Sequence, residues 1–176
     1  MIRLGWLLAS AALLSGCATP PGRLPGGEPP LAGRLTVRVE ATPTSEARNV
    51  SAAFELQGSP QQGRLDLSTP LGTTMAQAHW TPNRVALVTS QGETRFASLD
   101  DLTREVLGES VPVAALFDWL RGRPWPGAPS TPHESPEPGF RQLGWAVSLA
   151  RFGEGWISAR RDQPPAVSVR AKLDDR

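Results

Sequence analysis

Apolar and polar residues alternate along most of the chain between residues 35 and 97. The clearest run places Leu35, Val37 and Val39 on one side of the backbone and polar residues on the other. A period of two is typical of a half-buried β-strand. The same pattern predicts further strands at residues 50–57, 64–67, 73–80, 84–89 and 93–97, with turns at Pro82-Asn83 and Gln91-Gly92. This part of the chain is therefore predicted to be an antiparallel meander.

The apolar period changes from strand to helix after residue 97. The segment Ser98-Leu99-Asp100-Asp101 resembles a capping box, and Gly108 is a typical residue after a helix end. A second helix is expected to begin near Pro112, because proline is tolerated in the first turn. The expected apolar faces consist of Leu99, Leu102, Val106 and Leu107 in the first helix and Leu116, Trp119 and Leu120 in the second.

The last third of the chain returns to strands. Residues 122–139 hold six prolines and His133 and are predicted to form a long surface loop. Strands are expected at 142–152, 155–160 and 167–173, the first two joined by a Gly-Glu-Gly turn. The fold class is therefore mainly β: a curved antiparallel sheet that forms an incomplete, half-open barrel, with a few short helices covering or filling its concave face.

The N-terminus has the organisation of an export signal. A short basic segment ends at Arg3, and an apolar run at residues 4–14 is too short to cross a bilayer core of ~30 Å as a helix. The run closes with Leu14-Ser15-Gly16-Cys17, which resembles the lipobox of bacterial lipoproteins. That resemblance implies that residues 1–16 are cleaved and that Cys17 carries S-diacylglycerol and an N-acyl chain.

The segment after Cys17 is rich in proline and glycine and poor in large apolar residues, which is typical of an extended tether. We therefore expect residues 17–32 to be the lipidated N-terminus and tether, and residues 33–176 to be one β domain. Among lipoproteins, aspartate after the cysteine resembles an inner-membrane retention signal, and Ala18 and Thr19 stand here instead. A lipid-anchored protein of the outer membrane, facing the periplasm, is therefore expected.

Composition argues against several other functions. The 18 basic and 17 acidic residues become 17 of each once the leader with Arg3 is removed, so no net positive field favours nucleic acid. Cys17 is the only cysteine, which precludes an internal disulfide and a multi-cysteine zinc site.

Enzymatic chemistry has few candidate residues. The two histidines, His79 and His133, fall in a predicted strand and in the proline-rich segment, and Asp100 and Asp101 are explained by a helix start. The motifs G-x-S-x-G, H-E-x-x-H and G-x-x-x-x-G-K-[ST] do not occur. We expect no catalytic residue, no metal site and no cofactor other than the covalent lipid. A hydrolase is the disfavoured enzymatic alternative.

Leu71 is unusual because it stands in a Pro-Leu-Gly turn between two predicted strands, where polar residues are common. It either folds back onto the rim of the sheet or forms an apolar tip that touches a membrane or a lipid. The local sequence alone favours the first interpretation.

Several segments, in their order and spacing, resemble the LolB family of outer-membrane lipoprotein receptors. They are Gly33-Arg34-Leu35, residues 64–72, Asp118-Trp119-Leu120-Arg121-Gly122 and Arg170-Ala171-Lys172-Leu173, together with the lipobox. The resemblance implies an incomplete barrel with a hydrophobic cavity for the acyl chains of incoming lipoproteins. It also implies a protruding loop whose apolar residue, at the position of Leu71, assists insertion of cargo into the membrane.

The resemblance names the expected partners: a LolA-like periplasmic carrier, the acyl chains of lipoprotein cargo, and outer-membrane phospholipids. A monomer is expected. The predicted cavity lining consists of Val37, Phe54, Leu56, Leu65, Leu67, Trp80, Leu116, Trp119 and Leu120. Each of these residues is alternatively part of a closed core, as expected for a structural or assembly lipoprotein without an acyl-binding cavity.

Overall fold

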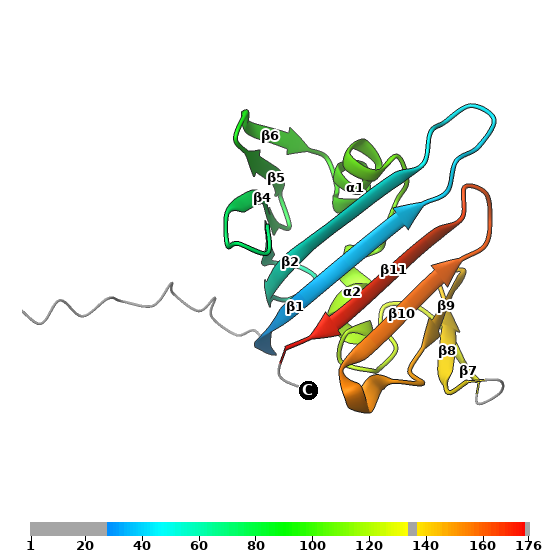
Figure 1. Ribbon diagram of the computed structural model, residues 1–176. Helices are drawn as coiled ribbons and strands as arrows, with labels where there is room; N and C mark the ends of the chain where they lie inside the picture. The colour runs from blue at the N-terminus through cyan, green and yellow to red at the C-terminus, as the bar shows by residue number, and fades with distance from the viewer. Residues whose placement is uncertain (1–27, 134–136, 175–176) are drawn as a thin grey trace, which may run out of the picture.

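A computed structural model of the protein describes residues 28–133 and 137–174 (Figure 1). These residues form one eleven-stranded antiparallel sheet with the strand order β6-β5-β4-β3-β2-β1-β11-β10-β9-β8-β7. The first meander comprises β1 (Glu28–Val39), β2 (Arg48–Gly58), β3 (Gly63–Ser68), β4 (Thr74–Thr81), β5 (Arg84–Thr89) and β6 (Gly92–Phe96). Two helices follow, α1 (Leu99–Leu107) and α2 (Val113–Trp119). The second group comprises β7 (Ser130–His133), β8 (Gly139–Gln142), β9 (Trp145–Ser148), β10 (Trp156–Arg161) and β11 (Val167–Leu173).

The two groups of strands join through the first and the last strand of the chain. Gly33 pairs with Leu173 and Val39 with Val167, so β1 and β11 run side by side over seven residue pairs. The outermost strands, β6 and β7, are the two edges of the sheet. In Figure 1 the strands β2, β1, β11 and β10 cross in front of the helices, which lie on the other face. The predicted fold class, an antiparallel sheet that does not close and carries a few short helices, is confirmed.

The predicted helices are confirmed with their capping residues. The hydroxyl of Ser98 accepts a hydrogen bond from the backbone N–H of Asp101 at 3.0 Å, and Gly108 ends α1 in the left-handed conformation. The helix α2 begins directly after Pro112, whose carbonyl accepts from Leu116. The predicted apolar face of α1 is wrong at one position, because Val106 is 40% exposed.

The region predicted as a surface loop contains two strands, which corrects the sequence interpretation. Strand β7 lies inside residues 122–139, and β8 begins at the last of these residues. The two strands pair as a hairpin. Proline fits β7 because an edge strand needs fewer backbone N–H donors than a central strand. The start of β1 also differs from the expectation. The strand begins at Glu28, inside the range 17–32 that the sequence pattern assigns to the tether.

The single strand predicted at 142–152 is wrong as well. Gln142 pairs with Trp145 across a two-residue turn in which Leu143 and Gly144 have φ values of 53° and 79°. Positive φ at both positions is the geometry of a tight hairpin turn, and it is normally encoded by Asn-Gly. Leucine in the first position hid the turn. A short 3-10 helix (Phe152–Glu154) then connects β9 to β10.

The hydrophobic core lies between the concave face of the sheet and the two helices. It includes inward residues of both groups of strands together with nearly all of α2. Gly63 on β3 is needed for this packing, because a Cβ there would lie 2.4 Å from the ring of Trp80. Within residues 28–133 and 137–174, no helix has the length and apolar character to span a membrane.

Candidate functional site

The nine residues predicted to line a cavity lie together on the concave side of the sheet. They come from β1, β2, β3, β4, α2 and the residue after α2. Seven belong to the buried core, namely Val37, Phe54, Leu56, Trp80, Leu116, Trp119 and Leu120. The other two, Leu65 and Leu67 on β3, are only partly buried against that core. The sequence thus identified the correct face and the correct residues for an apolar interior.

Aromatic side chains fill this interior in the present conformation. The rings of Trp80 and Phe117 meet edge to face at a centroid distance of 5.8 Å. Trp119 packs in the same way against Phe140, at 6.4 Å, and in a tilted arrangement against Trp145, at 6.0 Å. Four surface hollows lie elsewhere, beside the segment 44–48 and on the outer face near Trp156 and Arg141, and none of the nine residues lines these four.

The helices cover the concave face unevenly. In β8 to β11 the inward apolar residues are all buried, among them Phe140, Val147 and Val169. In β1 to β6 some inward apolar residues are buried and others are only partly buried. The partly buried ones are Leu31, Leu35, Val50, Leu65, Leu67, Leu87 and Phe96. The register places Leu65 opposite Leu56 and Ala78, and Ala78 opposite Leu87, so these side chains form one continuous apolar face. The less covered half is therefore the part of the interior that solvent, or an apolar ligand, reaches most readily.

The β3–β4 turn begins next to this half. Its backbone is closed by hydrogen bonds from Thr69 N–H to the Thr73 carbonyl and from Gly72 N–H to the Thr69 carbonyl, both 2.9 Å. The hydroxyl of Thr69 also accepts from the N–H of Thr73 at 3.2 Å. Gly72 takes a φ of +84°, a conformation that favours glycine. The turn is thus an ordered tip.

Leu71 stands at the end of this tip with 95% of its surface exposed. The interpretation that it folds back onto the rim of the sheet is wrong for this conformation. Met75, at the start of β4, is also 44% exposed. The alternating pattern did not single out Met75. A methionine at the start of a strand, directly after an apolar turn, is nevertheless a usable signal of an apolar tip. Leu67 is the last inward residue of β3 before the tip, and Leu71 and Met75 are the exposed apolar residues of the tip itself.

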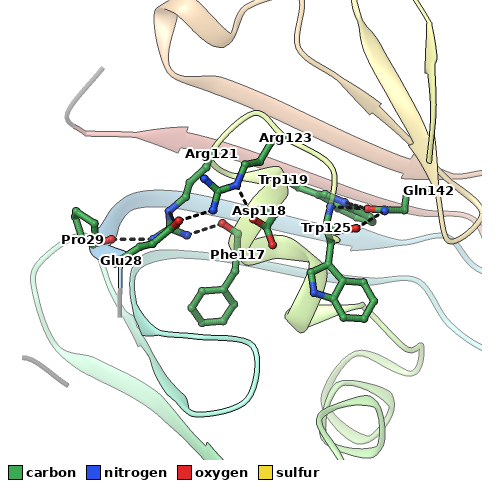
Figure 2. A network of polar contacts seen from close by, with 9 residues as sticks. All are labelled: Glu28, Pro29, Phe117, Asp118, Trp119, Arg121, Arg123, Trp125 and Gln142. Carbon is green, nitrogen blue, oxygen red and sulfur yellow. Dashed lines mark hydrogen bonds and ion pairs between the residues drawn. The ribbon is translucent and has the colours of Figure 1, made fainter. Parts of the chain in front are cut away.

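A buried glutamine holds the C-terminal end of α2 against the second group of strands. The side chain of Gln142 is 2% exposed and uses all of its hydrogen-bonding groups. Its carbonyl oxygen accepts from the Trp119 indole N–H at 2.7 Å and from the Trp125 backbone N–H at 2.9 Å. Its amide donates to the carbonyl of Trp125 at 2.7 Å (Figure 2). It also donates to the carbonyl of Ala128 at 2.7 Å. No local pattern indicates this role, because the four partner groups meet Gln142 only in the folded chain.

An ion-pair network holds the same end of α2 to the start of β1 (Figure 2). Glu28 pairs with both Arg121 and Arg123, and Arg123 also pairs with Asp118 at 2.6 Å. Arg121 donates to the carbonyls of Phe117 and Pro29 as well, at 2.5 and 2.9 Å. We call Glu28, Asp118, Arg121 and Arg123 the α2 clamp. The clamp connects β1, the strand that follows the expected tether, with α2, the helix that covers the core.

The clamp changes the protonation equilibria of its members. The hydrogen bond from Arg123 is the largest cause that lowers the pKa of Glu28 from its ordinary value of 4.5, and the charge of Arg121 adds to it. Burial is the largest cause that lowers the pKa of Arg121, and the neighbouring Glu28 opposes that shift. Glu28 is therefore ionised at neutral pH, as the clamp requires.

The helix α1 is attached differently. Arg48 donates to the last-turn carbonyls of Glu105 and Val106, at 3.2 and 3.1 Å, and the hydroxyl of Thr103 accepts from the N–H of Val111. Most of its contacts with the sheet are to β2, β5 and β6, the half whose apolar face is less covered. The clamp and Gln142 act on α2. The helix α1 is held by the bonds from Arg48, by its buried residues, and by the ion pair between Glu109, just after its end, and Arg161 on β10.

The residues considered for catalysis do not converge. His79 lies on β4, and the Nδ1 atom of His133 on β7 lies 2.8 Å from the Glu137 carbonyl. Asp101 pairs with Arg104 in the first turns of α1, and Asp100 accepts from the hydroxyl of Ser110 at 3.0 Å. Among the residues with described positions, no group of three or more histidine, cysteine, aspartate or glutamate side chains is placed to hold a metal ion. Cys17 lies outside the described residues.

Comparison with known proteins gives one consistent result. The family model described as "Outer membrane lipoprotein LolB" matches residues 30–173. The chain is 34% identical over 172 residues to the outer-membrane lipoprotein LolB of Bordetella petrii, an alignment that covers 91% of this chain and 86% of the relative. It is 31% identical to that of Cupriavidus metallidurans, over 95% of this chain and 84% of the relative. It is 32% identical to that of Bordetella pertussis, with coverages of 87% and 82%.

Substitution of Gln142 by leucine tests the buried glutamine. The variant leaves the Trp119 indole N–H and three backbone groups without their partner, and each buried unpaired group costs about 1–3 kcal/mol. We expect Gln142→Leu to lower the free energy of unfolding by at least ~3 kcal/mol in urea titrations followed by tryptophan fluorescence. The exposed Gln61→Leu serves as the matched control and should change little. Equal stability of the two variants would contradict the role assigned to Gln142.

Substitution of Glu28 by glutamine tests the α2 clamp through pH. Because the pKa of Glu28 is lowered in the folded state, its stabilisation is present above the unfolded-state pKa and is lost as the pH falls through the folded-state pKa. The side chain is nearly half exposed, so the loss at neutral pH should be at most ~1 kcal/mol. Urea titrations should show a difference between native chain and Glu28→Gln at pH 7 that disappears in acid. The control is Glu46→Gln, an exposed carboxylate outside the clamp.

Proposed function

The chain belongs to the LolB family of outer-membrane lipoproteins, and from this premise we propose that it is the lipoprotein receptor of the outer membrane. In this function it accepts lipoproteins from a LolA-like periplasmic carrier. It holds their acyl chains between the concave face of the sheet and the helices, and it inserts them into the inner leaflet.

The observation that carries the proposal is the exposed leucine at the end of an ordered turn. Leu71 is 95% exposed, and the turn that holds it begins two residues after Leu67, a partly buried residue of the concave face. A leucine kept in water forgoes about 1.5–3 kcal/mol of burial, which an apolar partner would restore. The inner region of a bilayer, or an acyl chain in transit, is such a partner.

The physical need for this arrangement follows from the cargo. Three acyl chains expose on the order of 40 methylenes, at ~0.8 kcal/mol each, so free passage through water costs upwards of ~30 kcal/mol. A receptor must accept the chains directly from the carrier. The sequence has no phosphate-binding loop to couple transfer to nucleotide hydrolysis, so transfer must run towards higher affinity.

The aromatic side chains packed in the interior occupy space that acyl chains would need. We infer that the room opens beneath α1, beside the less covered half of the sheet. The α2 clamp and Gln142 hold the other helix, whereas α1 is held near its end by the bonds from Arg48. Acyl methylenes entering there would contact Leu65, Leu67 and Leu87 and replace the contacts that α1 gives up.

Membrane attachment in this proposal rests on Cys17. Acylation of its sulfur and of the new N-terminus gives three chains, whereas a single myristoyl chain gives only marginal binding, with an association constant of about 10⁴ M⁻¹. The acyl chains of Cys17 therefore keep the receptor at the membrane that receives the cargo.

The filled interior also supports a second candidate, a structural or assembly lipoprotein whose core never opens. The two functions differ in one property, the ability to take up an acyl chain. The chain from Ala18 onward contains every residue of the described core and is suited to the test.

Uptake of an acyl probe decides between the two candidates. We expect the chain from Ala18 onward to bind a fluorescent fatty-acid probe saturably. Binding should weaken about tenfold in Leu67→Gln, because a polar amide replaces an apolar contact at the site of uptake. Leu143→Gln changes a 45% exposed leucine in another turn and should bind as the unchanged chain does. A chain that takes up no probe would favour the structural candidate.

Leu71 is assigned to delivery and not to uptake. We expect Leu71→Glu to receive lipoprotein from the purified carrier normally but to lower transfer into vesicles by about tenfold or more, since it removes a leucine that would be buried and adds a charge. Sedimentation of cargo with vesicles measures the second step. Leu143→Glu provides a control with the same change of charge on a different turn. Equal loss of both steps in Leu71→Glu would contradict the assignment.

A further inference from the structure

The arginine side chains differ in whether they have a carboxylate partner. Most described arginines pair with a carboxylate, as Arg64 does with Asp66, Arg84 and Arg95 with Glu93, and Arg104 with Asp101. Four exposed arginines differ, namely Arg34, Arg38, Arg141 and Arg170. Within residues 28–133 and 137–174, their guanidinium groups make no hydrogen bond or ion pair, and Arg170 has only a ring contact, to Trp156.

These four arginines lie on one surface, the convex face of the sheet. Arg34 on β1 stands opposite Lys172 on β11, and Thr36 opposite Arg170. Arg38 stands opposite Ser168, which faces Arg160 on β10, and Ala146 on β9 faces both Arg160 and Arg141. Figure 1 shows the strands β1, β11 and β10 side by side in front of the helices. We call Arg34, Arg38, Arg141, Arg160, Arg170 and Lys172 the basic face.

Several carboxylates near this face already have partners. Glu40 and Asp162 pair with Arg160, and Glu154 pairs with Arg151. Glu137 accepts a hydrogen bond from the hydroxyl of Ser148 at 2.6 Å. Glu55 and Asp66 lie further across the sheet, on β2 and β3, and mark where the basic character ends. The basic face is therefore a region of positive potential on a protein with a formal net charge of only +1.

The residues between the arginines indicate what the face binds. They are small and mostly hydroxylated: Thr36, Ser51, Ser148, Ser158 and Ser168. The only large apolar group among them is Trp156, which lies between the guanidinium groups of Arg151 and Arg170 at 5.4 and 5.6 Å. Stable protein interfaces need apolar anchors at their centre, and their cores are depleted in charge. Arginine forks and hydroxyl donors without such anchors suit phosphate oxygens, and tryptophan suits the headgroup layer.

We propose that the basic face binds the anionic phosphate headgroups of the membrane surface. The proposal takes from the proposed function only that the protein works at a membrane. Ten residues lie between Cys17 and Glu28, and the eleven Cα–Cα steps of an extended chain span at most ~40 Å. The chain then enters β1, the strand that carries Arg34 and Arg38, so a lipid anchor on Cys17 keeps this face within reach of the bilayer.

The experiment measures binding of the chain from Ala18 onward to vesicles. Vesicles of phosphatidylethanolamine with phosphatidylglycerol present anionic phosphate, and vesicles of phosphatidylcholine serve as the neutral reference. We expect preferential cosedimentation with the anionic vesicles, decreasing as salt is added. A variant with four changes, Arg34→Gln, Arg38→Gln, Arg141→Gln and Arg170→Gln, should lower that binding by roughly 600-fold, because each arginine near an anionic surface contributes about fivefold.

The matched control removes the same charge from elsewhere. The control variant changes four arginines that are already paired with carboxylates: Arg64→Gln, Arg84→Gln, Arg95→Gln and Arg104→Gln. It should bind anionic vesicles nearly as the unchanged chain does. Circular dichroism and urea titration verify that both variants fold. Uptake of the fatty-acid probe should be unchanged in the basic-face variant, so failure of this proposal is distinguishable from failure of the receptor function.

Three outcomes would overturn the proposal. The first is equal binding to anionic and neutral vesicles. The second is an equal loss in the control variant, which would mean that net charge alone matters. The third is that the basic-face variant retains vesicle binding but loses binding to the purified periplasmic carrier, which would assign the face to a protein partner.

Discussion

The protein must cover the apolar concave face of a single eleven-stranded sheet with two short helices, and this requirement shapes the rest of the structure. A sheet of this size presents more apolar surface than helices of nine and seven residues can bury. In β8 to β11 of the second group, all inward apolar residues are buried. The first group keeps a row of partly buried leucines, and that row leads to a turn whose leucine is fully exposed. In a protein that handles acyl chains, incomplete cover of this kind supplies apolar surface where it is needed.

The polar contacts of the interior add to this asymmetry. Gln142 and the α2 clamp attach α2 at its C-terminal end to both β1 and the second group of strands. Satisfied buried polar groups of this kind favour one arrangement strongly, because any displacement leaves donors and acceptors unpaired. The hydrogen bonds from Arg48 to the end of α1 are fewer and exposed. The C-terminal end of α2 is therefore held by more polar contacts than Arg48 gives to α1, and the segment after α1 is held in addition by the ion pair between Glu109 and Arg161.

The membrane enters the proposed mechanism at three places with different physical chemistry. The lipid on Cys17 would supply a permanent anchor, and Leu71 a small apolar contact at the tip of the β3–β4 turn. The basic face would supply a contact that depends on salt and on headgroup charge. Because the anchor enters the sheet at β1, whose outward side belongs to the basic face and whose inward side belongs to the core, the same strand links membrane position to the acyl-binding interior.

Local sequence determined a large part of this protein. Period-two alternation defined β2 to β6, Ser98 and Gly108 defined the ends of α1, and the apolar positions gave the nine interior residues, because each of these features depends on neighbours within a few positions. The tertiary structure decided the rest. It showed that Leu71 points into solvent, that Gln142 has four hydrogen-bond partners, that Pro132 lies in an edge strand, and that four arginines of the convex face have no carboxylate partner. These properties depend on residues brought together from distant parts of the chain, above all by the pairing of β1 with β11, and no local pattern records that pairing.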